Sequence, residues 1–123
     1  MKPLFLCYPK CSTCQKAKKF LSENLIDVEE RHIVENRPQK DELLNWMERY
    51  QGDAKKFFNT SGLVYREMAL KDKVKTMTPD QMAEVLSTNG MLVKRPLIIL
   101  ENTVLIGFKE EQWKAALLIN KQD

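Results

Sequence analysis

A pair of cysteines between an apolar strand and an amphipathic helix constrains this chain most. The stretch LCYPKCSTCQKAKKFL holds all three cysteines, and Cys11 and Cys14 form a C-x-x-C. The apolar run over residues 3–8 closes on a proline and predicts a buried strand. A helix is expected to follow this strand, with Ser12 or Thr13 as its N-cap. Its apolar face is formed at helical spacing by Cys14, Ala17, Leu21 and Leu25.

The middle of the chain predicts a second strand and then a helical block. Apolar and acidic residues alternate near the start of the segment 26–34, which indicates the strand. Pro38 is a start signal for the helical block, which is expected over about residues 38–90. Helices are expected at residues 40–50, 53–59, 63–70 and 78–90. In the last of them Thr78 and Gln81 form a capping box, and Gly90 is the expected stop.

The C-terminal part predicts a β-hairpin and a closing helix. Pro96 precedes an apolar run, Glu101-Asn102 forms the turn, and residues 103–106 form the second strand. Residues 109–120 are amphipathic. The predicted fold class is α/β, a β-α-β and β-β-α sheet with a helical insertion at about residues 38–90, in a single domain over residues 1–123.

Composition narrows the choice of partners and of compartment. The 123 residues are 43% apolar and 30% charged with a net charge of +3, and no basic run exceeds two residues. This predicts a soluble protein with no direct nucleic-acid contact. No secretory apolar segment and no span of about 20 apolar residues occurs, so we expect a cytoplasmic protein without membrane contact. Thiols in that compartment are kept reduced, and a disulfide there is usually transient and catalytic.

The cysteines allow four interpretations. A closed zinc site needs four ligands, and three cysteines with the distant His32 do not provide the usual pairs, so no metal is predicted. A structural disulfide would close only a tiny loop. Two unreactive buried cysteines remain an alternative. The fourth interpretation, redox chemistry, is favoured because a C-x-x-C beside a βαβ pattern is typical of thioredoxin-like proteins.

The redox interpretation assigns different roles to the two cysteines. Unpaired N–H groups at the helix start lower the pKa of Cys11, and Lys10 and Lys16 add positive charge nearby. Cys14, one turn further on, is placed to resolve a mixed disulfide on Cys11. Cys7 lies within the strand and is expected to be a buried structural residue. His32 is expected to be a surface or partly buried strand residue.

Arg95-Pro96 is the second informative motif. A proline at the start of a buried strand is confined to a few positions, and an X-Pro bond can be cis at low cost. A cis turn facing the C-x-x-C would bring Arg95 close to Cys11. The pattern leaves an alternative open, in which Pro96 only begins the strand and Arg95 points into solvent.

The segments YPKCSTCQKAKKFL, FFNTSGLVYREMALKDK and LVKRPLIILENTVLIGFKEEQW resemble the arsenate reductase family, including its Spx branch of redox-sensing transcription regulators. The resemblance implies a thioredoxin-like fold with an inserted helical subdomain, in which Cys11 is the nucleophile, Arg95 the oxyanion-site arginine and Pro96 the cis-proline. Pro96, Ser12 and Thr13 are expected to position the substrate. Glutaredoxin-dependent arsenate reductases are similar but use three arginines. Two of these arginine positions fall near Asn59 and Gly107 in this chain, so both arginines are missing, which predicts poor arsenate turnover.

Two functions follow from this resemblance. The first is a thiol–disulfide oxidoreductase with no bound cofactor, for which glutathione, glutaredoxin or thioredoxin is the electron donor. The second is an Spx-like regulator that binds the RNA polymerase α-subunit. Spx-like chains are expected to have a longer basic tail than the NKQD that ends this sequence, so the enzyme is favoured. A monomer is expected for either.

Overall fold

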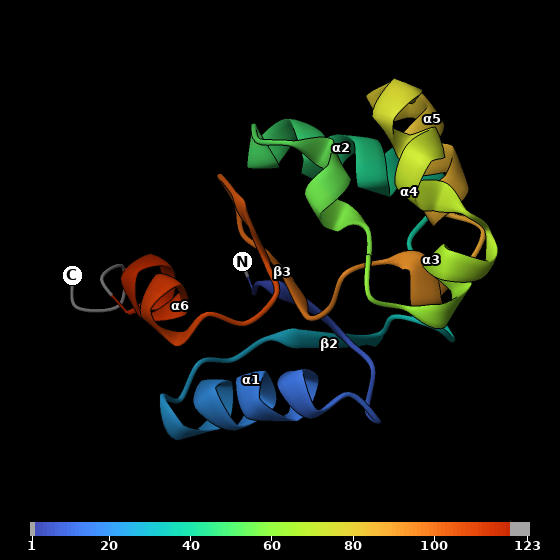
Figure 1. The fold of residues 1–123 in the computed structure, drawn as a ribbon. Coiled ribbons are helices and arrows are strands. Elements are labelled where there is room, and N and C mark those ends of the chain that lie inside the picture. The colour runs from blue at the N-terminus through green and yellow to red at the C-terminus, as the bar shows by residue number, and fades with distance from the viewer. Residues whose placement is uncertain (1, 119–123) are drawn as a thin grey trace.

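The computed structural model describes residues 2–118, and its centre is a sheet in the order β2-β1-β3-β4 (Figure 1). The strands are β1 (Leu4–Cys7), β2 (Glu29–His32), β3 (Leu97–Ile99) and β4 (Val104–Ile106). Strand β1 pairs in parallel with β2 and antiparallel with β3, which pairs antiparallel with β4. This arrangement has the β-α-β and β-β-α order that the sequence predicts.

Helices cover both faces of this sheet. The α-helices are α1 (Ser12–Glu23), α2 (Lys40–Tyr50), α3 (Leu63–Glu67), α4 (Leu70–Lys73), α5 (Pro79–Leu86) and α6 (Glu110–Leu117). Short 3-10 helices are η1 (Ala54–Phe57), η2 (Val74–Thr76) and η3 (Gly90–Leu92). Helices α2 to α5 lie together on the opposite side of the sheet from α1 and α6 (Figure 1). No helix among residues 2–118 has the length and apolarity needed to cross a bilayer.

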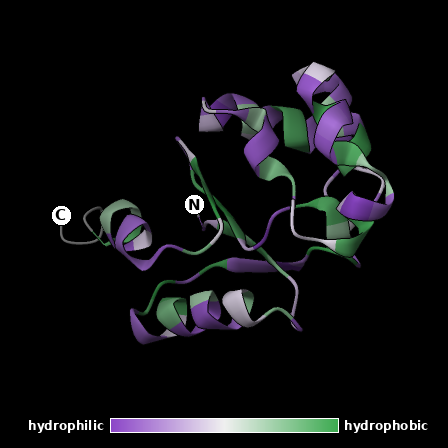
Figure 2. Ribbon diagram, in the orientation of Figure 1, coloured by the Kyte–Doolittle hydropathy of each residue, from purple (hydrophilic) through white to green (hydrophobic). Residues whose placement is uncertain are grey.

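Alternation along the strands builds two cores, because successive side chains of a strand point to opposite faces. The core between the sheet and helices α1 and α6 is formed by Phe5, Cys7, Cys14, Ala17, Phe20, Leu21, Ile98, Leu105, Trp113 and Leu117. On the other face Leu6, Leu97, Ile99 and Val104 pack against the helical block. Strand β2 is hydrophilic along its length, and Figure 2 shows it in purple at the edge of the sheet. Cys7 and Cys14 therefore share one core, at the end of β1 where the thiol site lies.

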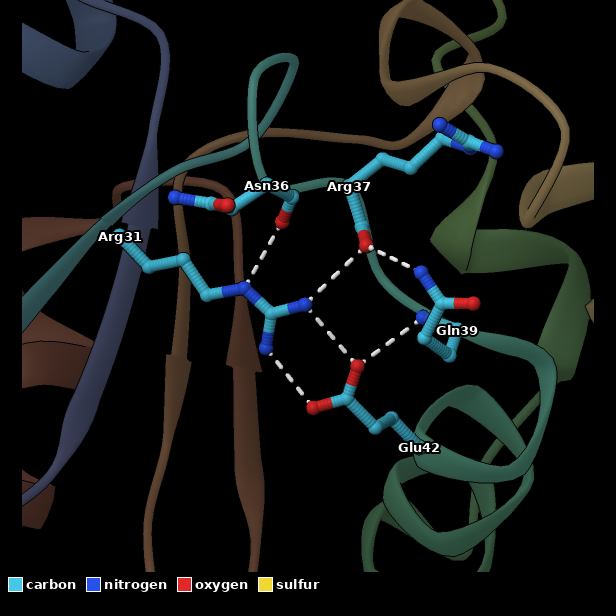
Figure 3. A network of polar contacts seen from close by, with 5 residues as sticks. All are labelled: Arg31, Asn36, Arg37, Gln39 and Glu42. Carbon is cyan, nitrogen blue, oxygen red and sulfur yellow. Dashed lines mark hydrogen bonds and ion pairs between the residues drawn. The ribbon is translucent and has the colours of Figure 1, made fainter.

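A network of polar contacts joins the end of β2 to the start of α2 (Figure 3). The Arg31 guanidinium donates to both carboxylate oxygens of Glu42, at 2.8 and 2.9 Å. It also donates to the carbonyl oxygens of Asn36 and Arg37, at 2.8 and 3.1 Å. The backbone N–H of Gln39 donates to Glu42 at 2.9 Å. These bonds hold the loop that carries the chain from the sheet into the helical block.

Two predicted helix boundaries in the block are wrong. The helix expected over residues 63–70 is two helices, because Ala69 adopts a left-handed conformation with φ of 52°. The break turns Leu70 and Val74 into the core. Gly90 does not stop α5, which ends at Leu86, but begins η3. A Cβ at Gly90 would collide with the carbonyl oxygen of Ile33, so glycine is needed there for close packing.

Other predicted elements are confirmed, with shorter bounds. The Thr78–Gln81 capping box starts α5, with the Gln81 N–H donating to the Thr78 hydroxyl oxygen at 3.2 Å. The second strand covers residues 29–32 rather than 26–34. The segment 53–59 forms only the 3-10 helix η1. The end of the predicted last helix, residues 119 and 120, lies outside the described residues.

Candidate functional site

The candidate site lies where β1 leads into α1. Strand β1 ends at Cys7 and the helix begins at Ser12, so a short loop carries Cys11 to the helix start. The Cys11 N–H donates to the Tyr8 carbonyl oxygen at 2.9 Å and closes this loop as a tight turn. All three cysteines are free thiols, and Cys11 is half-buried whereas the other two are buried.

Cys11 itself is the N-cap of α1, so the expectation that Ser12 or Thr13 caps this helix is wrong. Cys11 has an extended backbone, with φ of −88° and ψ of 122°, and its thiol makes no capping hydrogen bond. The open N-terminal N–H groups are therefore left to stabilise negative charge on the sulfur. Thr13 contributes through its backbone N–H rather than through its side chain.

The surroundings of Cys11 favour its thiolate. Partial burial raises the pKa of the thiol, but several groups outweigh it. The backbone N–H and the thiol of Cys14 both lower the pKa, as do the Thr13 N–H and the positive charge of Arg95. The net pKa of Cys11 lies below its ordinary value, in agreement with the sequence prediction. Hydrogen bonds to the charged form and a nearby cation are the two expected causes.

Cys14 has the opposite character. Its side chain is 2% exposed, and burial raises the pKa of the thiol to about 12. The backbone N–H of Tyr8, which donates to the Cys14 sulfur at 3.3 Å, lowers the pKa, and the charge on Cys11 raises it. The two thiols thus divide into an accessible one that ionises easily and a protected one that stays protonated.

Arg95 and Pro96 lie beside this pair. The Arg95–Pro96 peptide is cis, as the sequence analysis anticipates, and Pro96 is buried at the start of β3. The Arg95 charge lowers the pKa of both Cys11 and Cys14, which places the guanidinium at the site rather than in open solvent. Lys10 and Lys16, expected to add charge, are exposed on the surface.

Cys7 is a buried structural thiol, as predicted. It is 4% exposed and its sulfur donates to a carboxylate oxygen of Glu30 at 3.3 Å. Burial, and then the hydrogen bond and charge of Glu30, raise the pKa of Cys7 to about 12. His32, half-buried on β2, pairs in register with Cys7 and does not donate to either cysteine of the C-x-x-C in any hydrogen bond found among residues 2–118.

Tyr8 is a site residue that the sequence analysis missed. Its carbonyl group accepts from Cys11, its N–H donates to Cys14, and its ring lies 5.3 Å from the Arg95 guanidinium carbon. The signal that could have found it is an aromatic residue directly between the strand and the C-x-x-C. The two backbone bonds are local, but the ring contact joins Tyr8 to the later segment that carries Arg95, so no local pattern reveals it.

Asn59 and Gly107 lie on either side of the segment that carries Arg95. The Asn59 N–H donates to the Leu92 carbonyl oxygen at 2.7 Å, and the Gly107 N–H donates to that of Pro96 at 2.8 Å. Gly107 has φ of +73°, and a Cβ added there would lie 3.5 Å from Cε of Lys94. The two backbone bonds therefore join these positions to the two ends of the segment 92–96, which carries Arg95.

The described residues offer no metal site. Within residues 2–118 no group of three or more His, Cys, Asp or Glu side chains lies together in a way that could hold an ion. The chemistry that the site can perform is nucleophilic attack by a sulfur atom. A second sulfur, that of Cys14, lies one helical turn further along α1 and could resolve a mixed disulfide formed on the first.

A parallel β-α-β unit followed by an antiparallel hairpin, with a thiol at the N-cap of the first helix, defines a thioredoxin-like thiol protein. The model of the ArsC family matches residues 6–116. The chain belongs to the ArsC family.

Individual relatives support this assignment, and one of them is an Spx regulator. The uncharacterized protein YusI of Bacillus subtilis is 48% identical over 114 residues, 93% of this chain and 97% of YusI. The global transcriptional regulator Spx of Streptococcus agalactiae is 30% identical over 117 residues, 95% of this chain and 83% of Spx. The crystal structure of an ArsC family related protein from Bacteroides fragilis has a TM-score of 0.89 at 53% identity, with 94% of this chain and 97% of that chain covered.

Proposed function

We propose that this protein is a thiol–disulfide oxidoreductase in which Cys11 is the nucleophile and Cys14 the resolving thiol. The observation that carries the proposal is the contrast between the two thiols. Cys11 is half-buried at a helix N-terminus with a lowered pKa, and Cys14 is buried with a raised one. A pair of this kind separates attack from resolution, because only one thiol is ionised and accessible at the start.

The reaction proceeds by two exchanges. The Cys11 thiolate attacks one sulfur of a substrate disulfide; the substrate S–S bond breaks, and the leaving thiolate takes a proton from solvent. Cys14 then loses its proton and attacks the Cys11 sulfur of the mixed disulfide, which releases the second substrate thiol. The substrate has gained two electrons, and the Cys11–Cys14 disulfide is reduced again by a thiol donor such as glutathione, glutaredoxin or thioredoxin.

Arg95, Pro96, Ser12 and Thr13 serve this reaction as surrounding groups. Arg95 keeps positive charge near the reacting sulfur, which supports its ionised form. In this proposal Pro96, Ser12 and Thr13 help to position the substrate. Arsenate itself is a poor substrate in this proposal, because the family arginines expected near Asn59 and Gly107 are missing and a bound oxyanion would lose two charge-assisted contacts of about 1.5–3 kcal/mol each. The expected setting is the cytoplasm.

A trapping experiment tests the proposal. When the Cys14→Ser variant reacts with oxidised glutathione, a mixed disulfide between Cys11 and one glutathione should accumulate as the other glutathione leaves as a thiol, because no second cysteine resolves it. Intact mass should then show one glutathione adduct. The Cys7→Ser variant is the matched control, because it removes a buried thiol outside the pair. It keeps Cys14, so it should resolve the mixed disulfide and still reduce oxidised glutathione. Failure of Cys11 to form any adduct with glutathione or a small aromatic disulfide would contradict the proposal.

An Spx-like regulator is the second candidate function. The similarity to Spx over 95% of this chain favours it, and the same cysteine pair would then act as a redox sensor. Its partner would be the RNA polymerase α-subunit. A pull-down of that subunit with the reduced and the oxidised protein distinguishes the candidates, since specific capture supports the regulator and a clean negative with both forms removes it.

A further inference from the structure

Tyr8 contacts Cys11, Cys14 and Arg95, the three candidate catalytic residues. Its backbone bonds to Cys11 and Cys14 hold the two cysteines relative to the end of β1. Its ring faces the guanidinium of Arg95, with 5.3 Å between the guanidinium carbon and the ring centroid. This distance is within the range in which a cation is attracted to the face of an aromatic ring.

Arg95 is held by little else. Its Nη1 donates to the carbonyl oxygens of Met91 and Val93 at 3.3 and 3.5 Å, which are long for N–H···O hydrogen bonds, usually about 2.9–3.0 Å. Its Nε is buried without a hydrogen-bond partner. No ion pair joins Arg95 to a carboxylate among the residues that the structure describes. The ring of Tyr8 is therefore the main feature that orients this side chain.

His32 fixes the Tyr8 ring in turn. The two rings meet edge to face, with centroids 5.9 Å apart and planes at 86°. The His32 ring is itself fixed, because its Nδ1 accepts from the backbone N–H groups of Val34 and Glu35 at 3.2 and 3.1 Å. The order of contacts is thus from the β2–α2 loop to His32, to Tyr8, to Arg95.

We propose that Tyr8 is a positioning residue of the thiol site: its ring holds the Arg95 guanidinium beside Cys11 and Cys14 in the place that a carboxylate would otherwise take. A carboxylate would fix the guanidinium but cancel its charge, and would repel a thiolate nearby. An uncharged aromatic face fixes the side chain and leaves its whole positive charge to act on the sulfur atoms. The proposal rests on the proposed function, since it explains how the nucleophile of that reaction is kept ionised.

The test compares Tyr8→Leu with the conservative Tyr8→Phe, which keeps the ring. The readout is the rate of alkylation of Cys11 by iodoacetamide as a function of pH, measured at the peptide by mass spectrometry. Tyr8→Leu should raise the apparent pKa of Cys11. A rise of about half a pKa unit lowers the thiolate fraction at pH 7 about threefold, and because the more basic thiolate is more nucleophilic, alkylation should be about twofold slower. Tyr8→Phe should restore most of the wild-type rate.

A double-mutant cycle shows whether Tyr8 acts through Arg95. In the Arg95→Ala background, Tyr8→Leu should cause no further slowing, because the charge that the ring positions has already been removed. Equal slowing with and without Arg95 would overturn the proposal, as would an unchanged Cys11 profile in Tyr8→Leu. If Tyr8→Leu does not fold by circular dichroism, Tyr8→Met serves as a second ringless replacement.

The proposed function can fail separately from this inference. The glutathione trap with Cys14→Ser tests the exchange chemistry on a wild-type Tyr8, whereas the alkylation profile tests the coupling of Tyr8 to Arg95 without any substrate. A trapped adduct with no Tyr8–Arg95 coupling refutes only the positioning role. Coupling without an adduct refutes the oxidoreductase and leaves the positioning of Arg95 established.

Discussion

Limiting iodoacetamide at pH 7 is expected to modify Cys11 in the folded protein and to leave Cys14 and Cys7 as free thiols. All three cysteines lie within eight positions of the sequence, so only their tertiary surroundings can separate them. The reagent reacts with thiolates, and the pKa of each thiol sets how much thiolate is present. The alkylation rate of each cysteine therefore reports the electrostatic environment of its sulfur.

The magnitude follows from the pKa values. A thiol with the ordinary pKa of about 8.5 is about 3% thiolate at pH 7, and the lowered pKa of Cys11 makes its fraction larger. Burial raises the pKa of Cys14 and Cys7 to about 12, which leaves about 0.001% thiolate. The thiolate ratio is roughly 3,000. Thiolates of higher pKa are more nucleophilic, which reduces the difference in alkylation rate by a factor of about 25–60. Alkylation of Cys11 is therefore expected to be about 100-fold faster than that of Cys14 or Cys7.

Burial widens this preference further, since the Cys14 and Cys7 side chains are only 2% and 4% exposed. The assay is digestion and peptide mass spectrometry after timed labelling, with the same labelling in denaturant as the control. In denaturant the three cysteines should react at similar rates. Labelling of Cys14 or Cys7 within tenfold of the Cys11 rate in the folded protein would refute the assignment of nucleophile and resolving thiol.

Three further predictions concern the neighbouring residues. Arg95→Ala should raise the pKa of Cys11 with little loss of stability, measured by alkylation against pH and by thermal melting; an unchanged pKa would place the guanidinium away from the sulfur. Glu42→Gln should cost about 1–2 kcal/mol of unfolding free energy at pH 7, an amount limited by partial exposure. The hydrogen bonds from Arg31 lower the pKa of Glu42 in the folded protein. The stability that Glu42 adds is therefore present above the unfolded pKa of about 4.3 and is lost as pH falls through the folded pKa. A difference in stability between the variant and the wild type that grows toward pH 3 would contradict this. Arsenate turnover with glutathione and glutaredoxin should be absent or weak because positions 59 and 107 carry Asn59 and Gly107, and rates of about 1–10³ per second would contradict it.

The local features of the chain could be predicted from the sequence. The apolar run into Cys7, the helical spacing after Cys11 and the capping box at Thr78 depend on residues a few positions apart, and the structure has all three. The position of the thiol pair between a strand and a helix follows from the same short-range patterns. For this reason the lowered pKa of Cys11 was predictable in direction.

Contacts between distant segments needed the tertiary structure. The left-handed Ala69 breaks the predicted helix where Leu70 enters the core that the helical block shares with β1 and β3. The close approach of Gly90 to the β2–α2 loop could not be predicted from a pattern in which glycine usually ends a helix. Each of these choices is made by packing, which overrides local preference.

The sequence by itself determined which groups carry the chemistry, namely two thiols at a helix start and an arginine before a proline. Only the tertiary structure decided how Arg95 is held, because Tyr8 and Arg95 are far apart in the chain and meet only when β1 pairs with β3. The physical reason is range. Backbone propensity and capping act within one or two turns of chain, whereas the field at the Cys11 sulfur is the sum of charges and dipoles that folding brings together.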